Sequence, residues 1–292
     1  MKRRWIDKLF KQFFKVSGAF AVAVLLGIFL MLLSNGLMVF KDINFNEFLT
    51  IDWAPSAYTK PKYGILSMVF SSVMLTLMAM VIAVPIGVGA AAYLSEFAPK
   101  KVERFVKPAI EMLNAIPSVT IGFLGIVLLG PILSKLFGIS NGLNALNGAI
   151  LLAVMSLPTI ISIAEDAIYA VPNRFKEASY ALGANKWETL IKVTIPASSS
   201  GIIAAIMLGM GRVIGETMAV LMATGNAVAM PESIFSSVQP ITATIAIEMG
   251  EVPYDTPHYY SLFVLGIVLF LITLLINVTA DRITSKLQKH AL

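Results

Sequence analysis

The sequence has no cysteine and only two histidines among 292 residues. Disulfide bonds, thiolate metal ligands and cysteine nucleophiles are therefore excluded, and a histidine-based metal site is not expected. Charged residues are also scarce, at 13% against roughly 25% in an average soluble protein. Hydrophobic residues make up 57% of the chain, which excludes a soluble globular enzyme of this size as well as a disordered chain.

The hydrophobic residues are concentrated in six apolar stretches of about 20 residues or more, each long enough to cross a roughly 30 Å hydrocarbon core as a helix. A β-barrel is not expected, because these runs are continuous and do not alternate in segments of about ten residues. The sequence predicts an all-α polytopic membrane protein with six transmembrane helices. Their expected positions are 17–40, 64–94, 109–133, 147–170, 199–224 and 259–280.

Lysine and arginine gather on one side of these predicted spans. Seventeen of the 22 lie before the first span, after spans two and four, or in the tail, whereas four lie on the other side. Because basic residues are typical of cytoplasmic loops, both termini are expected in the cytoplasm and the protein in the cytoplasmic (inner) membrane. Residues 1–16 are expected to form a basic amphipathic segment ahead of an uncleaved first helix, and residues 284–292 a cytoplasmic tail.

The sequence also lacks a nucleotide-binding motif. The phosphate-binding loop G-x-x-x-x-G-K-[ST] needs a Gly-Lys pair, and none of the 20 glycines is followed by lysine. No loop on the predicted cytoplasmic side is long enough for a nucleotide-binding domain. If transport is driven by ATP, the ATPase is expected on another subunit, and this chain is expected to be non-catalytic, without cofactor or metal.

The loop between predicted spans four and five, residues 171–198, carries the signals of a short helix. Asn173 is placed to cap this helix at its start, and Gly183 is placed to end it. The helix is expected to run through Leu182 and to carry Glu177 near its middle.

A second short helix is predicted in the same loop. Asn185, followed three residues later by Glu188, resembles a capping box, and Pro196 closes the apolar segment that follows. Two short helices joined at Gly183 would form a compact knob projecting from the membrane. An amphipathic hairpin lying on the membrane surface fits the same pattern.

Loop 171–198 resembles the EAA loop of the permease subunits of ABC importers, whose pattern is E-A-A-x3-G-x9-I-x-L-P. The stretch EASYALGANKWETLIKVTIP aligns with all seven defining positions of this pattern. Serine stands in for the third defining residue, valine for the isoleucine and isoleucine for the leucine, and all three replacements are mild. In that family the loop docks into the ATPase subunit and its glycine makes the bend. The resemblance implies that the residues coupling this chain to an ATPase are Glu177, Ala178, Ser179, Gly183 and Pro196.

Predicted span five carries Arg212 near its centre and Glu216 four residues later. An arginine at the centre of a membrane helix costs roughly 2.5–3.5 kcal/mol on insertion scales, so its side chain must face protein or water. A spacing of four places both charges on one helix face, where they could merely neutralise each other as an ion pair. The alternative is a role in transport, because a guanidinium suits oxyanions such as phosphate, which need a positive group in a water-filled path.

The stretch GRVIGETMAVLM, which starts at Gly211, resembles the G-R-x-x-G-E-T-M-A-V stretch of the PstC-type permeases of high-affinity phosphate ABC importers. Residues 84–99, 114–131 and 241–283 agree with the same family. The resemblance implies a type-1 ABC transmembrane domain of five helices over residues 64–283. It further implies that phosphate passage involves Arg212, Glu216 and Thr217.

The same resemblance implies the partners of the chain. They are a second permease subunit of PstA type, a pair of ATPase subunits of PstB type, and an extracytoplasmic phosphate-binding protein of PstS type; no nucleic acid is expected. The expected substrate is inorganic phosphate. A permease for sulfate or molybdate is the alternative, and an ATP-independent channel or carrier is a less favoured one.

Four further polar residues have weaker sequence signals. Glu165 and Asp166, near the cytoplasmic end of predicted span four, could form a salt bridge or a gate but are expected to be solvated. Thr242 and Thr244 are expected in an interfacial segment at the outer leaflet, although a contact with the phosphate-delivering protein is an alternative.

Overall fold

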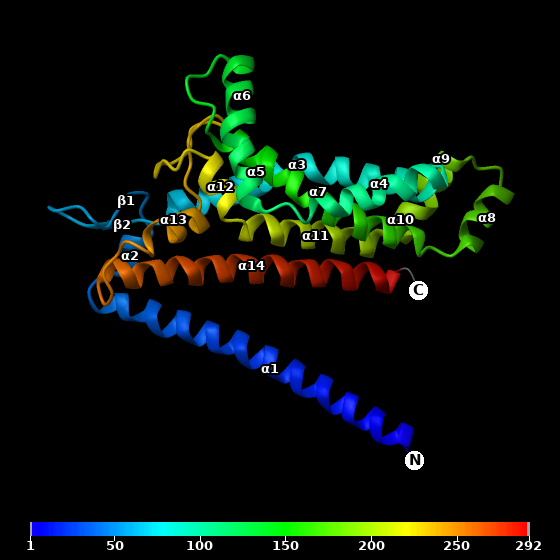
Figure 1. The fold of residues 1–292 in the computed structure, drawn as a ribbon, viewed down its shortest axis with the longest axis horizontal. Helices are drawn as coiled ribbons and strands as arrows, with labels where there is room; N and C mark the ends of the chain where they lie inside the picture. The colour runs from blue at the N-terminus through cyan, green and yellow to red at the C-terminus, as the bar shows by residue number, and fades with distance from the viewer. Residues whose placement is uncertain (1, 291–292) are drawn as a thin grey trace.

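The computed structural model describes the backbone of residues 2–290 and the side chains of residues 10–285. Long helices dominate the fold, and most of them run along its long axis (Figure 1). The long helices are α1 (Lys2–Met38), α3 (Leu66–Glu96), α7 (Ala145–Tyr169), α11 (Ser199–Gly215) and α14 (Pro257–His290).

Shorter elements connect the long helices. They are η1 (Val39–Lys41), α2 (Phe45–Phe48), β1 (Trp53–Ala54), β2 (Lys62–Tyr63), α4 (Lys100–Leu113), α5 (Ser118–Leu124), η2 (Gly125–Leu129), α6 (Gly130–Phe137), α8 (Asn173–Ala181), α9 (Lys186–Thr189), η3 (Leu190–Thr194), α10 (Ile195–Ala197), α12 (Met218–Ala223) and α13 (Ile241–Glu248). The strands β1 and β2 pair antiparallel, with Trp53 opposite Tyr63. The segments η2 and η3 are single π-helical turns inside longer helical runs.

The core of the bundle is formed by α3, α7 and α11. Small residues let these helices approach closely, as is typical of packing inside membranes. A Cβ atom added at Gly87 on α3 or at Gly209 on α11 would lie 2.7 Å or 2.6 Å from the side chain of Ile160 on α7. Ile160 is fully buried, so α7 is the central helix on which the other two pack.

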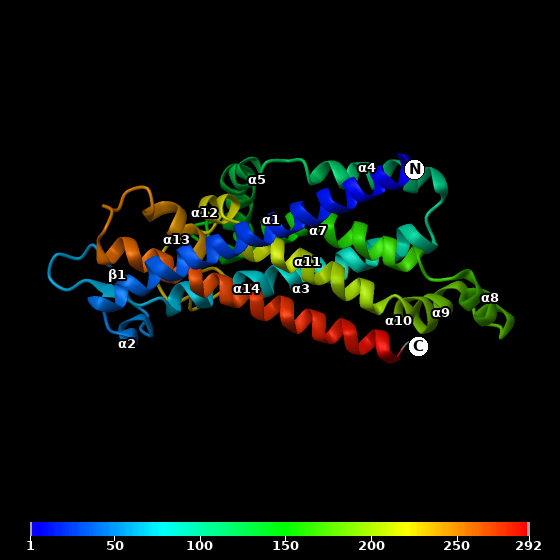
Figure 2. The ribbon, with the colours of Figure 1, turned by 90° about the horizontal axis from the view of Figure 1, so that it is seen from below.

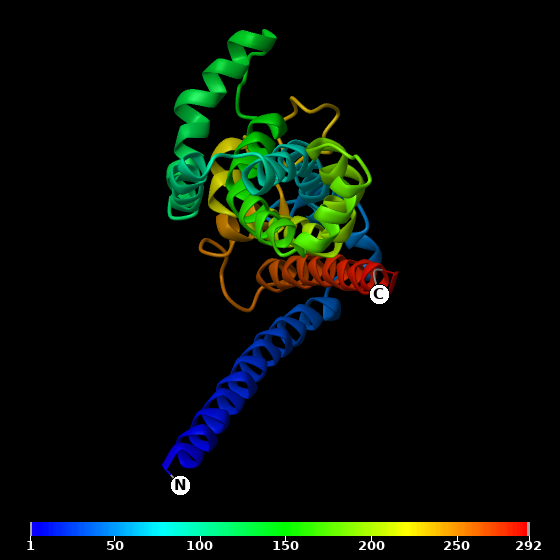
Figure 3. The same cartoon turned by 90° about the vertical axis from the view of Figure 1, so that its right-hand side faces the viewer.

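Helix α1 packs against α14 and then leaves the bundle, as Figure 3 shows. Gly36 lies against the backbone of Phe263, and the rings of Phe29 and Phe270 are 4.9 Å apart. None of the most apolar window within Phe10–Lys41 is buried by the rest of the chain. Its apolar surface therefore remains available to lipid or to another subunit.

The two ends of the bundle differ. The first turn of α1 and the last turn of α14 lie at the same end as α8 and α9, which we call the terminal end (Figures 1 and 2). The opposite end, which we call the loop end, holds α2, β1, β2 and α13. That the terminal end faces the cytoplasm stays a prediction.

Five described helices are long and apolar enough to cross a membrane, or six if the bent pair Lys186–Ala197 and Ser199–Gly215 counts as one span. The prediction of a single helix over 109–133 was wrong. The helix ends at Leu113, and a new one begins at Ser118 after Pro117. A proline lacks the N–H that a continuous helix needs and disfavours helical backbone in the residue before it, so the break lies where the sequence places its proline.

Predicted span five, residues 199–224, is also interrupted. Helix α11 ends at Gly215, and Glu216 has extended backbone with ψ 131° before α12 starts at Met218. The helix before α11 is bent from it by 71° at Ser198. Helix α11 is therefore a straight segment with a change of direction at each end.

An ion pair holds α4 against α7 near the terminal end. The Nζ of Lys107 lies 3.1 Å from Oε2 of Glu165 and 3.3 Å from Oδ1 of Asp166. Glu165 is only 4% exposed, so the expectation that it is solvated was wrong and its alternative, a salt bridge, is confirmed. Asp166 remains largely exposed, because it points away from the buried face of α7.

We expect Lys107→Met to lower the stability of the protein by about 1–2 kcal/mol, because it leaves the buried Glu165 carboxylate without its cation. Full removal of one partner from a buried pair costs more, but the side chain of Lys107 is one-third exposed and water replaces part of the contact. The measurement is the thermal unfolding midpoint of the full chain in detergent. The comparison variant is Asp166→Asn, which should lower the midpoint much less, because Asp166 is 74% exposed and its contact with Lys107 is largely replaced by water. A Lys107→Met midpoint equal to wild type would contradict the prediction.

Candidate functional site

Arg212 lies near the end of α11 and is half-buried. Its Nη1 donates a hydrogen bond of 2.7 Å to Oδ1 of Asn114, an exposed residue directly after α4. Among the side chains of residues 10–285, no carboxylate lies within 4.0 Å of the guanidinium. The charge of Arg212 is therefore met by a neutral amide oxygen and leaves donors free for another acceptor.

Glu216 does not pair with Arg212, and the alternative of a neutralising ion pair on one helix face was wrong. Its backbone is extended and lies beyond the end of α11, so the spacing of four no longer places the two side chains together. The Oε1 of Glu216 instead accepts hydrogen bonds from the backbone N–H groups of Thr217 at 3.2 Å and Ala219 at 3.4 Å. The carboxylate thus stabilises the first turn of α12.

The segment around Glu216 is held from two sides. The carbonyl of Glu216 accepts a hydrogen bond of 2.9 Å from the hydroxyl of Thr242, and the hydroxyl of Thr217 lies 3.4 Å from the carbonyl of Gly215. The hydroxyl of Ser72 on α3 accepts from the backbone N–H of Ile241 at 3.0 Å. Helix α13 is therefore attached to the break in α11 and to α3.

Thr242 and Thr244 are buried within the chain, and their expected position in an interfacial segment at the outer leaflet stays a prediction. Helix α13 turns back into the bundle, where Thr242 contacts Glu216 and Thr244 donates to the carbonyl of Pro240 at 3.2 Å. Sequence reasoning missed Asn114 and Ser72, and it also missed the contact between Thr242 and Glu216. Asn114 lies 98 residues from Arg212, and no local pattern links residues that far apart.

Broken helices are tolerated inside membranes where the freed backbone is buried in protein or lines a water-filled cavity. Here the break at residues 216 and 217 lies one turn beyond a guanidinium that has free donors. A guanidinium presents a planar set of N–H groups that matches carboxylates and phosphates. The arrangement can bind an oxyanion beside α11, with Arg212 as its cationic contact.

Loop 171–198 forms a second candidate site at the terminal end. Helices α8 and α9 are joined around Gly183, whose φ of +87° is left-handed. The predicted capping box is confirmed, because Glu188 N–H donates to Oδ1 of Asn185 and Asn185 N–H donates to Oε2 of Glu188, both at 2.9 Å. The two short helices project beyond the bundle as a knob (Figure 2).

The predicted cap at Asn173 was wrong. Pro172 holds the N-cap position, and Asn173 is the first residue of α8, so its side chain makes no capping hydrogen bond. Proline already has the φ that precedes a helix start, and the short side chain of Asn173 then lies inside the first turn. The helix also ends at Ala181, one residue before the expected position.

The predicted coupling residues occupy different depths of the knob. The hydroxyl of Ser179 lies 2.9 Å from that of Thr189, a buried contact that joins α8 to α9. Glu177 and Ala178 are exposed, and Leu182 at the bend is 90% exposed. The role of the predicted residues in coupling to an ATPase stays a prediction.

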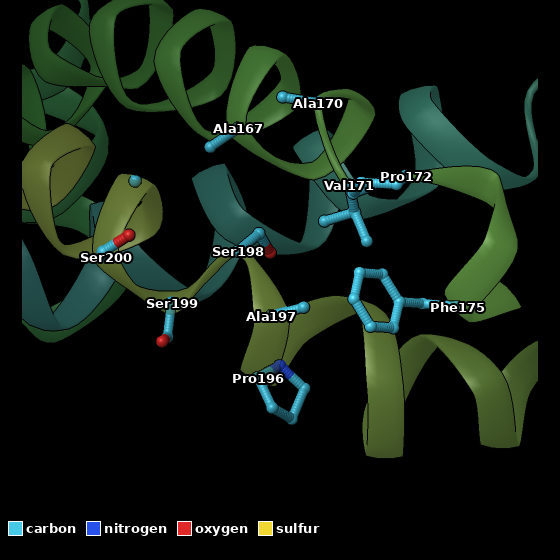
Figure 4. Close-up of a pocket in the computed structure, with 11 residues that line it drawn as sticks. Ala167, Ala170, Val171, Pro172, Phe175, Pro196, Ala197, Ser198, Ser199 and Ser200 are labelled. Carbon is cyan, nitrogen blue, oxygen red and sulfur yellow. The ribbon is translucent and has the colours of Figure 1, made fainter. Parts of the chain in front are cut away.

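An ion pair and a cavity lie at the root of the knob. The Nζ of Lys176 is 2.5 Å from Oε1 of Glu96 at the end of α3. A cavity of about 660 Å³ separates the end of α7 from the start of α11, with Phe175 on one wall and Pro196 and Ser198 on another (Figure 4). Pro196 therefore lies where the knob joins α11, and the predicted coupling residues and Arg212 are connected through that one helix.

The chain matches one protein family over residues 83–289, and this family is described as "Binding-protein-dependent transport system inner membrane component". Two curated relatives align over most of the chain. The "Probable ABC transporter permease protein YqgH" of Bacillus subtilis is 37% identical over 91% of this chain and 86% of that protein. The "Phosphate transport system permease protein PstC" of Mesorhizobium japonicum is 33% identical over 92% of this chain and 87% of that protein.

Two solved structures share the fold. A chain of the MetNI methionine ABC transporter in an inward facing conformation superposes with a TM-score of 0.61, covering 76% of this chain and 95% of that one at 19% identity. A chain of a bacterial ABC transporter involved in the import of the acidic polysaccharide alginate gives a TM-score of 0.62, with 88% and 89% coverage at 14% identity. At these identities the likeness concerns the fold alone.

Proposed function

This chain belongs to the family of inner membrane components of binding-protein-dependent transport systems, and on that premise we propose that it is the permease subunit of an ATP-driven phosphate importer. The relatives named phosphate transport system permease support phosphate as the substrate. The observation that carries the proposal is the guanidinium of Arg212, which has free donors and lies beside a break in a membrane helix. A permease for sulfate or molybdate remains the alternative, because a guanidinium accepts all three oxyanions.

We infer a part in this function for each site residue. Arg212 would replace some of the water around the anion, which otherwise loses its hydration on entering the membrane. Glu216 would keep α12 in place beyond the break through its contacts with Thr217 and Ala219. In this proposal Glu216 stabilises the path, and its carboxylate does not cancel the charge of Arg212.

We infer one partner for each end of the bundle and one more for the path between them. The terminal end would face the cytoplasm, because seventeen of the 22 basic residues belong to the segments predicted there. The knob of loop 171–198 would dock on an ATPase subunit of PstB type, and the loop end would receive phosphate from a binding protein of PstS type. A second permease subunit of PstA type would complete the path.

Coupling would pass through contacts within the chain. ATP binding and hydrolysis in the partner would move the knob, and the movement would reach Arg212 through α11, which begins at the root of the knob. The chain itself would make and break no covalent bonds. The guanidinium of Arg212 would contact the anion in one state of the transporter and release it in the other, as the two ends of the path open in turn.

The test is uptake of radiolabelled phosphate at low external phosphate, in cells with and without this chain. We expect uptake that requires the chain, depends on ATP, and is not reduced by excess sulfate or molybdate. Uptake that persists without the chain would overturn the proposed function. Strong competition by sulfate or molybdate would keep the permease and replace the substrate with another oxyanion.

A further inference from the structure

The hydrogen bond between Arg212 and Asn114 joins two segments that are distant in the chain. Asn114 is the C-cap of α4, and its side chain reaches Nη1 of Arg212 at 2.7 Å. The position of Asn114 is determined by the break that Pro117 imposes and by the ion pair of Lys107 with Glu165, which fastens α4 to α7. Contacts on α4 therefore fix the position of the Asn114 amide oxygen independently of Arg212.

The contact is notable for the kind of acceptor that it uses. An aspartate has nearly the same shape as asparagine, and its carboxylate would form a shorter and stronger charge-assisted contact with a guanidinium. Such a carboxylate would also compete directly with any anion that binds Arg212. A neutral amide oxygen orients the guanidinium and leaves its charge intact. An anion that binds Arg212 can displace it more easily than a carboxylate.

The surroundings of Arg212 give the neutral acceptor its importance. Within the described side chains no carboxylate lies in salt-bridge distance of the guanidinium, and the nearest acid in sequence, Glu216, is engaged by the backbone of α12. Asn114 is exposed, so the contact faces the open side of α11 and not the packed core. An anion arriving on that side would meet a cation that is already oriented.

We propose that Asn114 is a positioning residue for anion passage: its neutral amide oxygen holds the guanidinium of Arg212 toward the path without cancelling its charge. The proposal rests on the proposed function. It assigns Asn114 a part in selectivity for anions, because a carboxylate at this position would act as an internal competitor. Asn114 itself need not touch the substrate.

Two substitutions of similar volume separate charge from shape. Asn114→Asp should raise the KM for phosphate uptake at least about tenfold, because the new carboxylate pairs with Arg212. Asn114→Leu removes the acceptor without adding charge, and we expect KM to rise about threefold with little change in maximal rate. Gln12→Glu is the matched control, since it makes the same change from an amide to a carboxylate at an exposed position of α1, and it should transport as wild type.

A second measurement does not depend on transport. Phenylglyoxal modifies accessible arginines, and mass spectrometry of the purified full chain reports its reaction with Arg212. Asn114→Asp should slow this reaction several-fold, whereas Asn114→Leu should not slow it. Phosphate should protect Arg212 in the wild type and fail to do so in Asn114→Asp.

The outcomes distinguish the two proposals. Equal labelling of Arg212 in wild type, Asn114→Asp and Asn114→Leu would overturn the role of Asn114, whatever the chain transports. Equal KM values in the two variants would also overturn it, because the charge would then be immaterial. Wild-type labelling that no oxyanion slows would instead count against Arg212 as the anion contact, and so against the proposed function.

Discussion

Replacing Arg212 with alanine is expected to abolish phosphate uptake, lowering its rate by about a hundredfold or more, while the protein still folds and assembles. A hydrogen bond to a charged group is worth roughly 1.5–3 kcal/mol, and a guanidinium can donate two of them to one oxyanion, so the loss should be about 3 kcal/mol or more. Each 1.4 kcal/mol is about tenfold in rate. Stability should not fall, because the charge costs roughly 2.5–3.5 kcal/mol to place in a membrane helix and its contact is a single neutral hydrogen bond. The measurement is initial uptake, normalised to the amount of assembled protein.

Two controls accompany this result. Arg212→Lys keeps the charge but loses the planar set of donors, so it should retain part of the uptake. Lys135→Ala removes an exposed cation at the end of α6, away from the contact with Asn114, and should leave uptake unchanged. Normal uptake by well-expressed Arg212→Ala protein would remove Arg212 from the transport path.

Replacing Gly183 with valine is expected to uncouple the chain from its ATPase. The φ of Gly183 is +87°, a region that costs a β-branched residue roughly 1–3 kcal/mol. A Cβ atom there would meet no atom within 4 Å, so crowding is not the cause of the effect. The strain should turn α9 relative to α8 and displace the surface around Leu182 that we propose for docking.

Uncoupling is measured by copurification of the ATPase subunit and by phosphate uptake. Gly183→Asn should behave much as wild type, because asparagine tolerates left-handed backbone. Gly138→Val imposes the same strain at the end of α6, where φ is +65° and nothing lies within 4 Å, and it should not affect the ATPase. Normal copurification together with normal uptake in Gly183→Val would contradict the prediction.

The fold class and the knob could be predicted because their signals are local. Continuous apolar runs give the membrane helices, and a helix cap depends on residues three apart, so Asn185 and Glu188 could be paired from the sequence. Asn173 shows the limit of that logic. Whether a residue is the cap or the first helical position depends on its neighbour, here Pro172.

The contacts of the candidate site were harder to predict because they are tertiary. The spacing of Arg212 and Glu216 predicts one helix face only if the helix is continuous, and the backbone at Glu216 is extended. Glu165 looks solvated on its own helix, and it becomes buried only because α4 brings Lys107 to it. Periodicity cannot reveal such partners, since they come from other segments of the chain.

The changes of direction at Ser198 and Glu216 make α11 a rigid lever with a joint at each end. Arg212 lies 14 residues from Ser198, which is about 20 Å along a helix. A tilt of α11 by roughly 10° about Ser198 would move Arg212 about 3.5 Å sideways. A displacement of that size would break the 2.7 Å hydrogen bond to Asn114. A small rotation of the knob would thus suffice to release the guanidinium of Arg212 from Asn114.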